Sequence, residues 1–599
     1  MDNYCTFNQL AFRRYGGSSN EPWRFTEGNL KGEMHNSNHQ SFAVGTHAVA
    51  SGKFYFEYYI YEINGSNGIY GGIGGDRPCY SNNNYLHGAS ESNFPYVEWH
   101  TNAHAGTNVT GATAAGTHGL SCTTGDIVMT AFDLDNGKCY WGKNGTWFNS
   151  GNPATGTNPG VSGFLGAPTT NWIIYWDGNA SSGAGGVVLN CGQDSSFAGY
   201  ATSQGNQDGN DKGDFYYAPP AGFLALCASN MADPSIALPG ENFNTVLWSG
   251  VNAANSITGV GFQPDMLWFK ARNNSSNHRV QDAVRGATNP LYPNDSAVSS
   301  AGDTNLNAFD SDGFSMNQNP QSGGMGNYAS DTYVGWNWKA GGAPTATNSA
   351  GAGNVPTAGS VKINGSNSSS ALAGTIPAKK ISANTTAGFS IVQYTGTGSG
   401  GTIAHGLSKA PDMIISKGYS TGAAYNWRVG GAALGMTSAD YSMPLDLDNA
   451  EQNLSGVFGA YPAATVWTIG TDAGVNDSGK DYIVYCFHNV EGYSKVDFFG
   501  GNADTNGSFI YTGFRPAYTI IKRVYTANDW MIGDDETSPY NVTNNMLRAN
   551  ITNAQQSGNY VDYLSNGFKL RLSGNALNGA GRYLYLAFAE YPFKTTNAR

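Results

Sequence analysis

Charged residues are scarce in this 599-residue chain. Asp, Glu, Lys and Arg make up 12% of it, about half of the usual share. Long helices and coiled coils are rich in Glu, Lys, Leu and Ala, so this composition excludes a helical bundle. Disordered chains combine high charge with few aromatics, whereas aromatics make up 13% here. No run of about 18 apolar residues, the length of a membrane-spanning helix, occurs either.

Basic clusters are missing as well. The net charge is −12, and the basic runs are no longer than the pairs Arg13-Arg14, Lys379-Lys380 and Lys522-Arg523. A nucleic-acid partner is therefore not expected, because phosphate binding needs a basic stripe.

The cysteines show neither a disulfide pattern nor a zinc-binding pattern. The seven cysteines are odd in number and form no C-x-x-C pair, which excludes the usual zinc and disulfide patterns. No metal or cofactor is expected. The start, MDNYCTFNQLAFRRYGG, has no apolar core, so we expect no signal peptide and synthesis in a reducing cytoplasm.

Glycine and aromatic residues are abundant instead. The chain has 81 Gly, 35 Tyr, 28 Phe and 13 Trp, which predicts an all-β, multidomain protein of tandem β-sandwiches. In SGKFYFEYYIYEI, Phe54 to Ile60 alternate with period two, as in a long half-buried strand. Asn136-Gly137 and Asn144-Gly145 predict two successive hairpin turns.

The second half of the chain repeats itself three times. Each copy has a proline followed six residues later by a lysine, with an apolar run between them. Each copy opens with a strand about 21 residues earlier and closes with an aromatic strand 67 to 71 residues later. The anchors are Pro264/Lys270, Pro411/Lys417 and Pro516/Lys522, and the closing strands lie at Tyr333, Tyr482 and Tyr583.

The spacing predicts β modules of about 100 residues, each with its own core. The segment between the first two copies is rich in Gly, Ser, Ala and Thr, which is typical of a flexible linker. The alternative is an ordered segment, which neighbouring parts of the chain or other subunits would have to hold. The expected boundaries are 1–235 for an N-terminal sandwich, 240–342 for copy 1, 343–388 for the linker, 389–492 for copy 2 and 493–599 for copy 3.

Two resemblances follow from these residues. GKFYFEYYI (52–60), GGIGGD (71–76), GDIVMTAFDLDNGKCYWGKNG (125–145) and LNCGQDSSFAGY (189–200) make the N-terminal unit similar to a SPRY domain, a concanavalin-like jelly roll. That resemblance implies a binding module without catalysis. The aromatic after the turn is Tyr140-Trp141, a mild departure from the family's pattern.

The remainder resembles modules of tail-fibre and other virion proteins of marine bacteriophages. GVGFQPDMLWFKAR, VRGATN (284–289) and DTYVGWNWKAGG in copy 1, and GFRPAYTIIKR and YLYLAFAEYPFK in copy 3, carry this likeness. It implies a non-enzymatic virion surface protein, with other virion proteins, further copies of itself (a trimer in many fibres) and a host glycan or protein as partners. An architectural virion protein and a polysaccharide depolymerase are the alternatives. No ligand-binding residue is implied.

Two motifs suggest chemistry but have a simpler interpretation. GYSTG (Gly418–Gly422) matches the nucleophile elbow of hydrolases, which needs a helix after the serine. A strand-like AAYNWRVGG follows here, so we expect a hairpin loop. GGIGGD (71–76) lacks the following helix of a phosphate-binding loop, so we expect a strand and a turn.

Other candidate residues are also expected to be structural. The aspartate pairs 133/135, 310/312, 446/448 and 534/535 are predicted in turns, with calcium as the alternative. The pairs His35/His39 and His100/His104 would bind a metal only on a helix, which their sequences disfavour. Tryptophans 99, 172, 176, 248, 268, 336, 338, 427, 467 and 530 are expected mainly in the core, with a minority on loops that contact glycan.

Overall fold

The computed structural model describes residues 2–11, 13–14, 23–34, 39–63, 69–75, 95–100, 104–116, 121–166, 171–180, 185–298, 305–318, 326–431 and 436–596. Strands dominate throughout, and the prediction of an all-β protein is confirmed. Among the described residues the one α-helix is α1 (Ala473–Asn476). The chain forms two compact units, Met1–Asp233 with Phe509–Tyr511 (unit 1) and Pro234–Ser508 with Thr512–Arg599 (unit 2).

Unit 1 is a sandwich of two sheets. The first has the order β1 (Arg13–Arg14), β4 (His39–Val49), β14 (Trp172–Ala180), β6 (Ile69–Gly75), β7 (Tyr96–His100), β8 (His104–Thr107). The second has the order β2 (Trp23–Thr26), β3 (Lys31–Met34), β15 (Gly185–Asn190), β5 (Lys53–Ile63), β10 (Ile127–Asp133), β11 (Lys138–Lys143), β13 (Val161–Ser162), β9 (Thr113–Ala114), with β12 (Thr146–Trp147) on β11 and β16 (Leu224–Ala225) on β5. Aromatic side chains from both sheets fill the space between them, as where Tyr58 meets Trp176 at 4.9 Å between ring centroids.

Strand β5 is more deeply buried than its alternation predicts. Phe54, Phe56, Tyr58 and Ile60 face the core between the sheets as expected. Tyr55 and Glu57 on the opposite face are also 0% exposed. The half-buried prediction is wrong there because the irregular segment 191–227 covers this face. Glu57 holds that segment through hydrogen bonds from the Tyr216 and Tyr217 N–H groups, at 3.0 and 2.8 Å.

Both predicted hairpin turns are confirmed. β10 pairs antiparallel with β11 around Asn136-Gly137, and β11 pairs with β12 around Asn144-Gly145. Gly137, Asn144 and Gly145 all have positive φ, the conformation that Asn and Gly adopt most readily.

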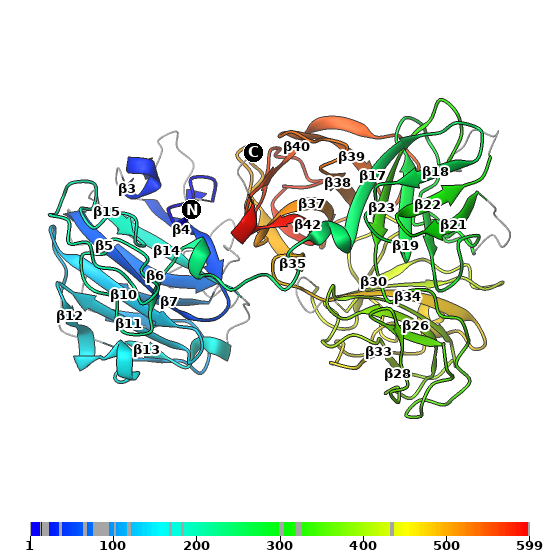
Figure 1. The fold of residues 1–599 in the computed structure, drawn as a ribbon, viewed down its shortest axis with the longest axis horizontal. Coiled ribbons are helices and arrows are strands. Elements are labelled where there is room, and N and C mark those ends of the chain that lie inside the picture. Colours follow the sequence, from blue (N-terminus) through cyan, green and yellow to red (C-terminus); the bar gives the residue numbers. More distant parts are fainter. Residues whose placement is uncertain are drawn as a thin grey trace. The chain divides into compact units, whose positions relative to one another are not determined.

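Unit 2 contains the three copies, and their central sheets share one strand order. Each runs from the opening strand to the closing strand, then to the proline–lysine strand and its hairpin partner. In copy 1 these are β17 (Phe243–Ser249), β23 (Thr332–Trp338), β19 (Met266–Ala271) and β20 (Arg279–Asp282); in copy 2, β27 (Phe389–Thr395), β34 (Asp481–Phe487), β29 (Met413–Gly418) and β30 (Arg428–Gly430); in copy 3, β35 (Ser494–Gly501), β42 (Gly581–Pro592), β37 (Phe514–Arg523) and β38 (Met531–Asp534). Figure 1 labels β17, β23 and β19 of copy 1 and β35, β42, β37 and β38 of copy 3.

Further strands extend these sheets or cover them. Copy 2 adds β31 (Tyr441–Pro444) and β32 (Gln452–Asn453), and copy 3 adds β39 (Thr543–Arg548), β40 (Gln556–Leu564) and β41 (Gly567–Leu570). Separate small sheets are β18 (Asn255–Thr258), β22 (Gly313–Met316) and β21 (Leu306–Asp310) in copy 1, and β28 (Gly401–Ala404) with β33 (Val466–Ile469) in copy 2.

The register of the sheets shows which residues are equivalent. Met266, Met413 and Tyr518 each pair with the aromatic residue at one position of the closing strand: Trp338, Phe487 and Phe588. The anchor lysines lie four residues further along in every copy. The anchor prolines therefore occupy corresponding places, two residues before this register position.

The three copies share one central core, so the prediction of separate cores is wrong in that respect. A single cluster of buried side chains draws on all three copies. At its centre lie the three aromatic residues that share one register position. The ring centroid of Phe588 is 5.8 Å from that of Trp338 and 6.0 Å from that of Phe487, and both contacts are edge-to-face. Copies 1 and 2 each have a second cluster on the other face of their sheet.

Residues 343–388 form ordered structure, so the prediction of a flexible linker is wrong. β24 (Val361–Ile363), β25 (Ser366–Asn367) and β26 (Ala378–Asn384) extend the sheet of copy 2 through the pairing of β26 with β27. Val361, Ile376 and Ile381 are buried. These few apolar residues, spaced among Gly, Ser and Thr, are enough to order the segment, because strand pairing provides hydrogen-bond partners for its backbone N–H and C=O groups.

Candidate functional site at the junctions between copies

The GYSTG motif is a hairpin connection, as predicted. Gly418 ends β29, and β30 follows in place of a helix. Ser420 Oγ accepts a hydrogen bond from the Asp481 N–H at 2.9 Å. The hydroxyl is thus part of the loop's own structure.

The glycines of GGIGGD form strand β6, as expected, and Asp76 lies outside the described residues. A Cβ on Gly72 would lie 2.1 Å from the Val97 carbonyl oxygen, and one on Gly71 would lie 3.0 Å from the rings of Trp176 and Trp99. Glycine is required here for close packing rather than for phosphate binding.

The aspartate pairs lie in turns or at the strand ends that lead into them: Asp133 ends β10, Asp310 ends β21 and Asp534 ends β38. Asp133 Oδ1 accepts from the N–H groups of Asp135 and Asn136, both at 3.0 Å, and Asp312 accepts from Gly259 and Gly261. Asp534, predicted in a turn, ends β38 and is 2% exposed. Its carboxylate contacts another copy, as described below.

The described members of the histidine pairs, His39, His100 and His104, lie on strands. His100 and His104 are register partners across β7 and β8, and His39 begins β4; His35, His87 and His118 lie outside the described residues. Within the described residues, no group of three or more His, Cys, Asp or Glu side chains could hold a metal ion.

The core prediction for the tryptophans is confirmed for nine of the ten. Trp248 alone is partly buried, and it packs against the second cluster of copy 1.

The three anchor lysines are buried, and Lys417 and Lys522 each bond across a junction between copies. Lys270, Lys417 and Lys522 are 0% exposed. Lys417 Nζ donates to the Tyr425 carbonyl of its own copy at 2.6 Å and to the Ser296 carbonyl of copy 1 at 2.7 Å. Lys522 Nζ does the same with Asn528 of copy 3 and Asp448 of copy 2, at 2.6 and 2.9 Å. Each of these two ammonium groups therefore joins neighbouring copies.

Opposite each lysine, an aromatic ring N–H donates to the neighbouring copy. Trp427 Nε1 donates to the Tyr292 carbonyl of copy 1, and Trp530 Nε1 to the Pro444 carbonyl of copy 2, both at 2.9 Å. His278 holds the equivalent position in copy 1, and its Nε2 lies 2.9 Å from the Arg548 carbonyl of copy 3. The bonds thus run around the three copies and close a ring.

The protonation of His278 follows from its partners. A carbonyl only accepts, so Nε2 carries the proton, while Nδ1 accepts from Trp268 Nε1 at 3.1 Å. Burial lowers the pKa of His278 to about 3, so the ring is neutral.

A second set of polar contacts links two of the three junctions. Tyr485 of copy 2 donates its hydroxyl to Asp282 of copy 1 at 2.9 Å. At the equivalent positions, Trp336 of copy 1 donates to Asp534 of copy 3 at 3.2 Å. The third junction has Leu586 and Gly431 at these positions. Donor and acceptor are both absent there, so neither of these two positions leaves a buried polar side chain without its partner.

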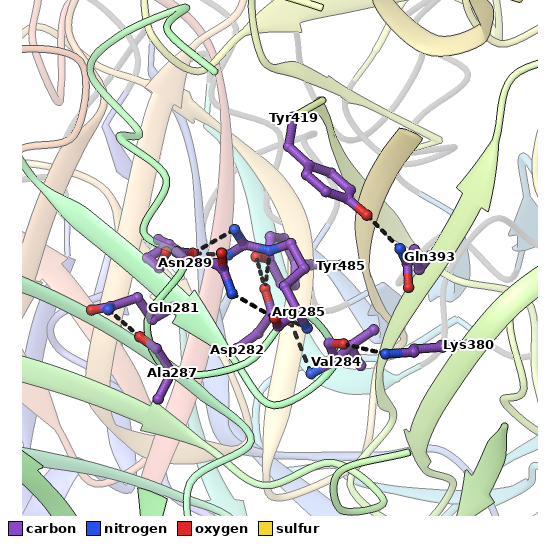
Figure 2. Close-up of polar contacts among 11 residues, drawn as sticks. Gln281, Asp282, Val284, Arg285, Ala287, Asn289, Lys380, Gln393, Tyr419 and Tyr485 are labelled. Atoms are coloured by element: carbon purple, nitrogen blue, oxygen red, sulfur yellow. Dashed lines mark hydrogen bonds and ion pairs between the residues drawn. The ribbon is translucent and has the colours of Figure 1, made fainter. Parts of the chain in front are cut away.

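The junction of copies 1 and 2 contains the densest of these networks (Figure 2). The Arg285 guanidinium contacts Asp282 Oδ2 at 2.6 Å, and both side chains are almost fully buried. Arg285 also donates to the Asn289 carbonyl at 2.6 Å and lies over the ring of Tyr419 at 5.8 Å. The positive charge of Arg285 is thus compensated by the Asp282 carboxylate, the Asn289 carbonyl and the ring of Tyr419.

This arrangement holds the copies together rather than presenting reactive groups. The ion pair, the ring donors and the lysines all bond to neighbouring protein groups. Sequence reasoning located the lysines by their repeated spacing but assigned them no role. It missed Asp282, Arg285 and Tyr485, although Arg285 lies within VRGATN. Tyr485 reaches Asp282 across 203 residues of sequence, and no local pattern reveals such a contact.

The lysines predict a pH dependence of stability. Burial lowers the pKa of Lys417 to about 8, from an ordinary value near 10.5. Between these values the unfolded chain binds more protons than the folded chain, so this group's contribution to stability rises with pH. The neutral amine still has two N–H groups for its two carbonyls. We expect Lys417→Met to reduce the slope of unfolding free energy between pH 8 and 10 by up to about 1.4 kcal/mol per pH unit.

Urea unfolding of both chains at several pH values measures this difference. Lys379→Met, which alters a partly exposed lysine paired with Asp481, is the matched control and should leave the slope unchanged. Parallel slopes for wild type and Lys417→Met would contradict the prediction.

No described helix is long and apolar enough to cross a membrane.

Comparison with solved structures finds weak likenesses over about a third of the chain. The SPRY domain of human HERC1 is 15% identical, with a TM-score of 0.22, and the match covers 31% of this chain and 96% of that one. The basic winged bean lectin with Tn-antigen is 11% identical, with a TM-score of 0.23 and 31% and 94% coverage. The carbohydrate-binding module CBM66 from Bacillus subtilis is 8% identical, with a TM-score of 0.19 and 30% and 91% coverage.

Comparison with the curated proteins gives no match. A family match, in contrast, covers the repeats. Residues 238–364 and 358–592, together more than half of the chain, match a family described as a domain of unknown function (DUF7483). The two matched segments meet within the segment 343–388 that the structure joins to copy 2. The chain belongs to the DUF7483 family.

Proposed function

We propose that this chain is a non-enzymatic structural protein of a bacteriophage virion, a component of a tail fibre or similar appendage that contacts the host cell surface. The observation that supports this proposal most is the closure of three copies around one aromatic core. Such a body keeps its surface loops in fixed positions under load, which suits an adhesive appendage.

Adhesion by such a protein would depend on avidity. Many copies on a symmetric particle bring weak individual contacts to the same cell surface, and linked sites raise the apparent affinity by orders of magnitude. The partner would be a host surface glycan or protein. The SPRY-like resemblance of unit 1 suggests a binding module at one end of the chain.

Competition for adsorption tests the proposal. Purified full-length chain, added to host cells before the phage, is expected to lower the rate of adsorption in a dose-dependent way. The same chain after heat denaturation is the control and should have no effect. An antibody against the chain should label the particle in electron micrographs.

Two other outcomes would replace this proposal. Label on the particle without competition or cell binding would identify an architectural protein, such as a head decoration or tail adaptor. Release of reducing sugar from host envelopes would identify a depolymerase, which needs a carboxylate pair at a spacing suited to glycoside hydrolysis.

A further inference from the structure

The opening strand of each copy has one edge that its own closing strand does not use. In copy 1, the bonds at either end of β17 show which of its residues face β23. The Asn242 carbonyl accepts from the Lys339 N–H just after β23, and the Gly250 N–H donates to the Asp331 carbonyl just before it. Because residues of an antiparallel strand alternate, the N–H and C=O groups of residues 245, 247 and 249 point away from β23. These groups form the free edge of β17.

Copy 2 covers the equivalent edge with a strand. β26 pairs antiparallel with β27, and Gln393, which corresponds to Leu247, is opposite Lys380. This edge position of the repeat therefore accepts an added strand without distortion.

Copy 3 covers its edge with side chains. Asn489 accepts from the Val496 N–H at 2.6 Å and donates to its carbonyl at 3.1 Å, as a neighbouring strand would. Asp497 accepts from the Phe498 N–H, and Ser508 donates to the Gly500 carbonyl, both at 2.7 Å. Arg582 lies 3.9 Å from the ring centroid of Phe498, the residue that corresponds to Leu247.

In copy 1, a side chain covers only the beginning of the outer edge of β17. Asn244 accepts from the Thr245 N–H at 2.9 Å. Among the described residues, no partner is found for the outward N–H and C=O groups of Leu247 and Ser249. Leu247 is 39% exposed and Val251, just beyond the strand, is 49% exposed. An uncovered strand edge with apolar side chains is a template for pairing with another strand.

We propose that this exposed half of β17 is an interface, and that it pairs antiparallel with β17 of a second copy of the chain. The strand FNTVLWS carries no charge, so self-pairing brings no like charges together. Two-fold pairing would satisfy the outward groups of Leu247 and Ser249 in both chains and bury both leucines. The proposal does not depend on the function proposed above.

The dimer is expected to be weak. Stable protein interfaces bury more than about 1,000 Å², and the exposed half of β17 with the side chains of Leu247 and Val251 covers less than that. On a particle or within a fibre, a high local concentration would compensate for the low affinity.

Sedimentation velocity of the full-length chain over a series of concentrations tests this interface. Wild type is expected to move from the 63.3 kDa monomer toward a dimer as concentration rises. Leu247→Pro removes the outward N–H and leaves the ladder to β23 intact, and Leu247→Lys places two charges face to face. Both variants should remain monomeric at concentrations where wild type is half dimeric.

Val355→Lys is the matched control, since Val355 is 59% exposed and lies outside β17. It should dimerise as wild type does. Circular dichroism and thermal melting establish that each variant is folded. A wild-type chain that stays monomeric throughout, or a dimer that survives both Leu247 variants, overturns the proposal; in the first case a strand from a different protein becomes the candidate occupant.

Discussion

Replacing Phe588 with alanine should lower the free energy of unfolding of unit 2 by about 3–5 kcal/mol and weaken all three copies at once. Phe588 is 1% exposed and contacts Trp338, Phe487 and Tyr518 from the three copies. Truncation leaves a cavity at the point where these copies meet. The neighbouring rings are held by their own sheets and cannot close it.

Hydrogen exchange measured by mass spectrometry distinguishes a common core from three separate ones. Peptides from β23, β34 and β42 should all lose protection in Phe588→Ala. The control is Phe132→Ala, which removes an equally buried ring from the core of unit 1 and should affect β5 and β10 alone. Loss of protection confined to β42 would mean that the copies are independently stable.

Much of the local structure of this chain could be predicted because its signals are local. Period-two alternation identified β5, and Asn-Gly dipeptides placed two hairpins. The spacing of Pro264, Pro411 and Pro516 from their lysines identified strands that the structure shows in the same register. A repeat preserves such spacing because the same sheet has to form each time.

The packing of the copies could not be predicted because it depends on which face of a sheet meets another. Trp338, Phe487 and Phe588 are each an aromatic residue in a strand, and alternation does not reveal their common contact. The segment 343–388 was misinterpreted for a related reason. Its composition resembles a linker, but a partly open edge of copy 2 provides its backbone with partners.

The junction residues show a further limit of sequence reasoning. A lysine at fixed repeat spacing inside an apolar run indicates a special position. The sequence does not reveal that Lys417 and Lys522 each bond one carbonyl of another copy. The paired loss of donor and acceptor at Leu586 and Gly431 is visible only after the register of all three sheets is known. Coupled substitutions of this kind mark contacts that are kept or lost as a unit.

Asp282→Ala should cost about 3–5 kcal/mol of unfolding free energy, because it leaves the Arg285 guanidinium buried without a counter-charge. Urea unfolding measures the loss. The control is Lys379→Ala, which breaks a partly exposed ion pair with Asp481 and should cost at most about 1 kcal/mol.

Removing both charges of the Asp282–Arg285 pair distinguishes the cost of burying an unpaired Arg285 charge from the loss of the attraction between the two side chains. The double variant Asp282→Leu/Arg285→Met should be more stable than Asp282→Ala, since apolar groups of similar size replace a buried ion pair at little cost. It should still fall short of wild type, because the Tyr485 hydroxyl loses its acceptor. If the double variant were no more stable than Asp282→Ala, the ion pair would not be the source of the loss, and the packing of the two side chains would have to account for it.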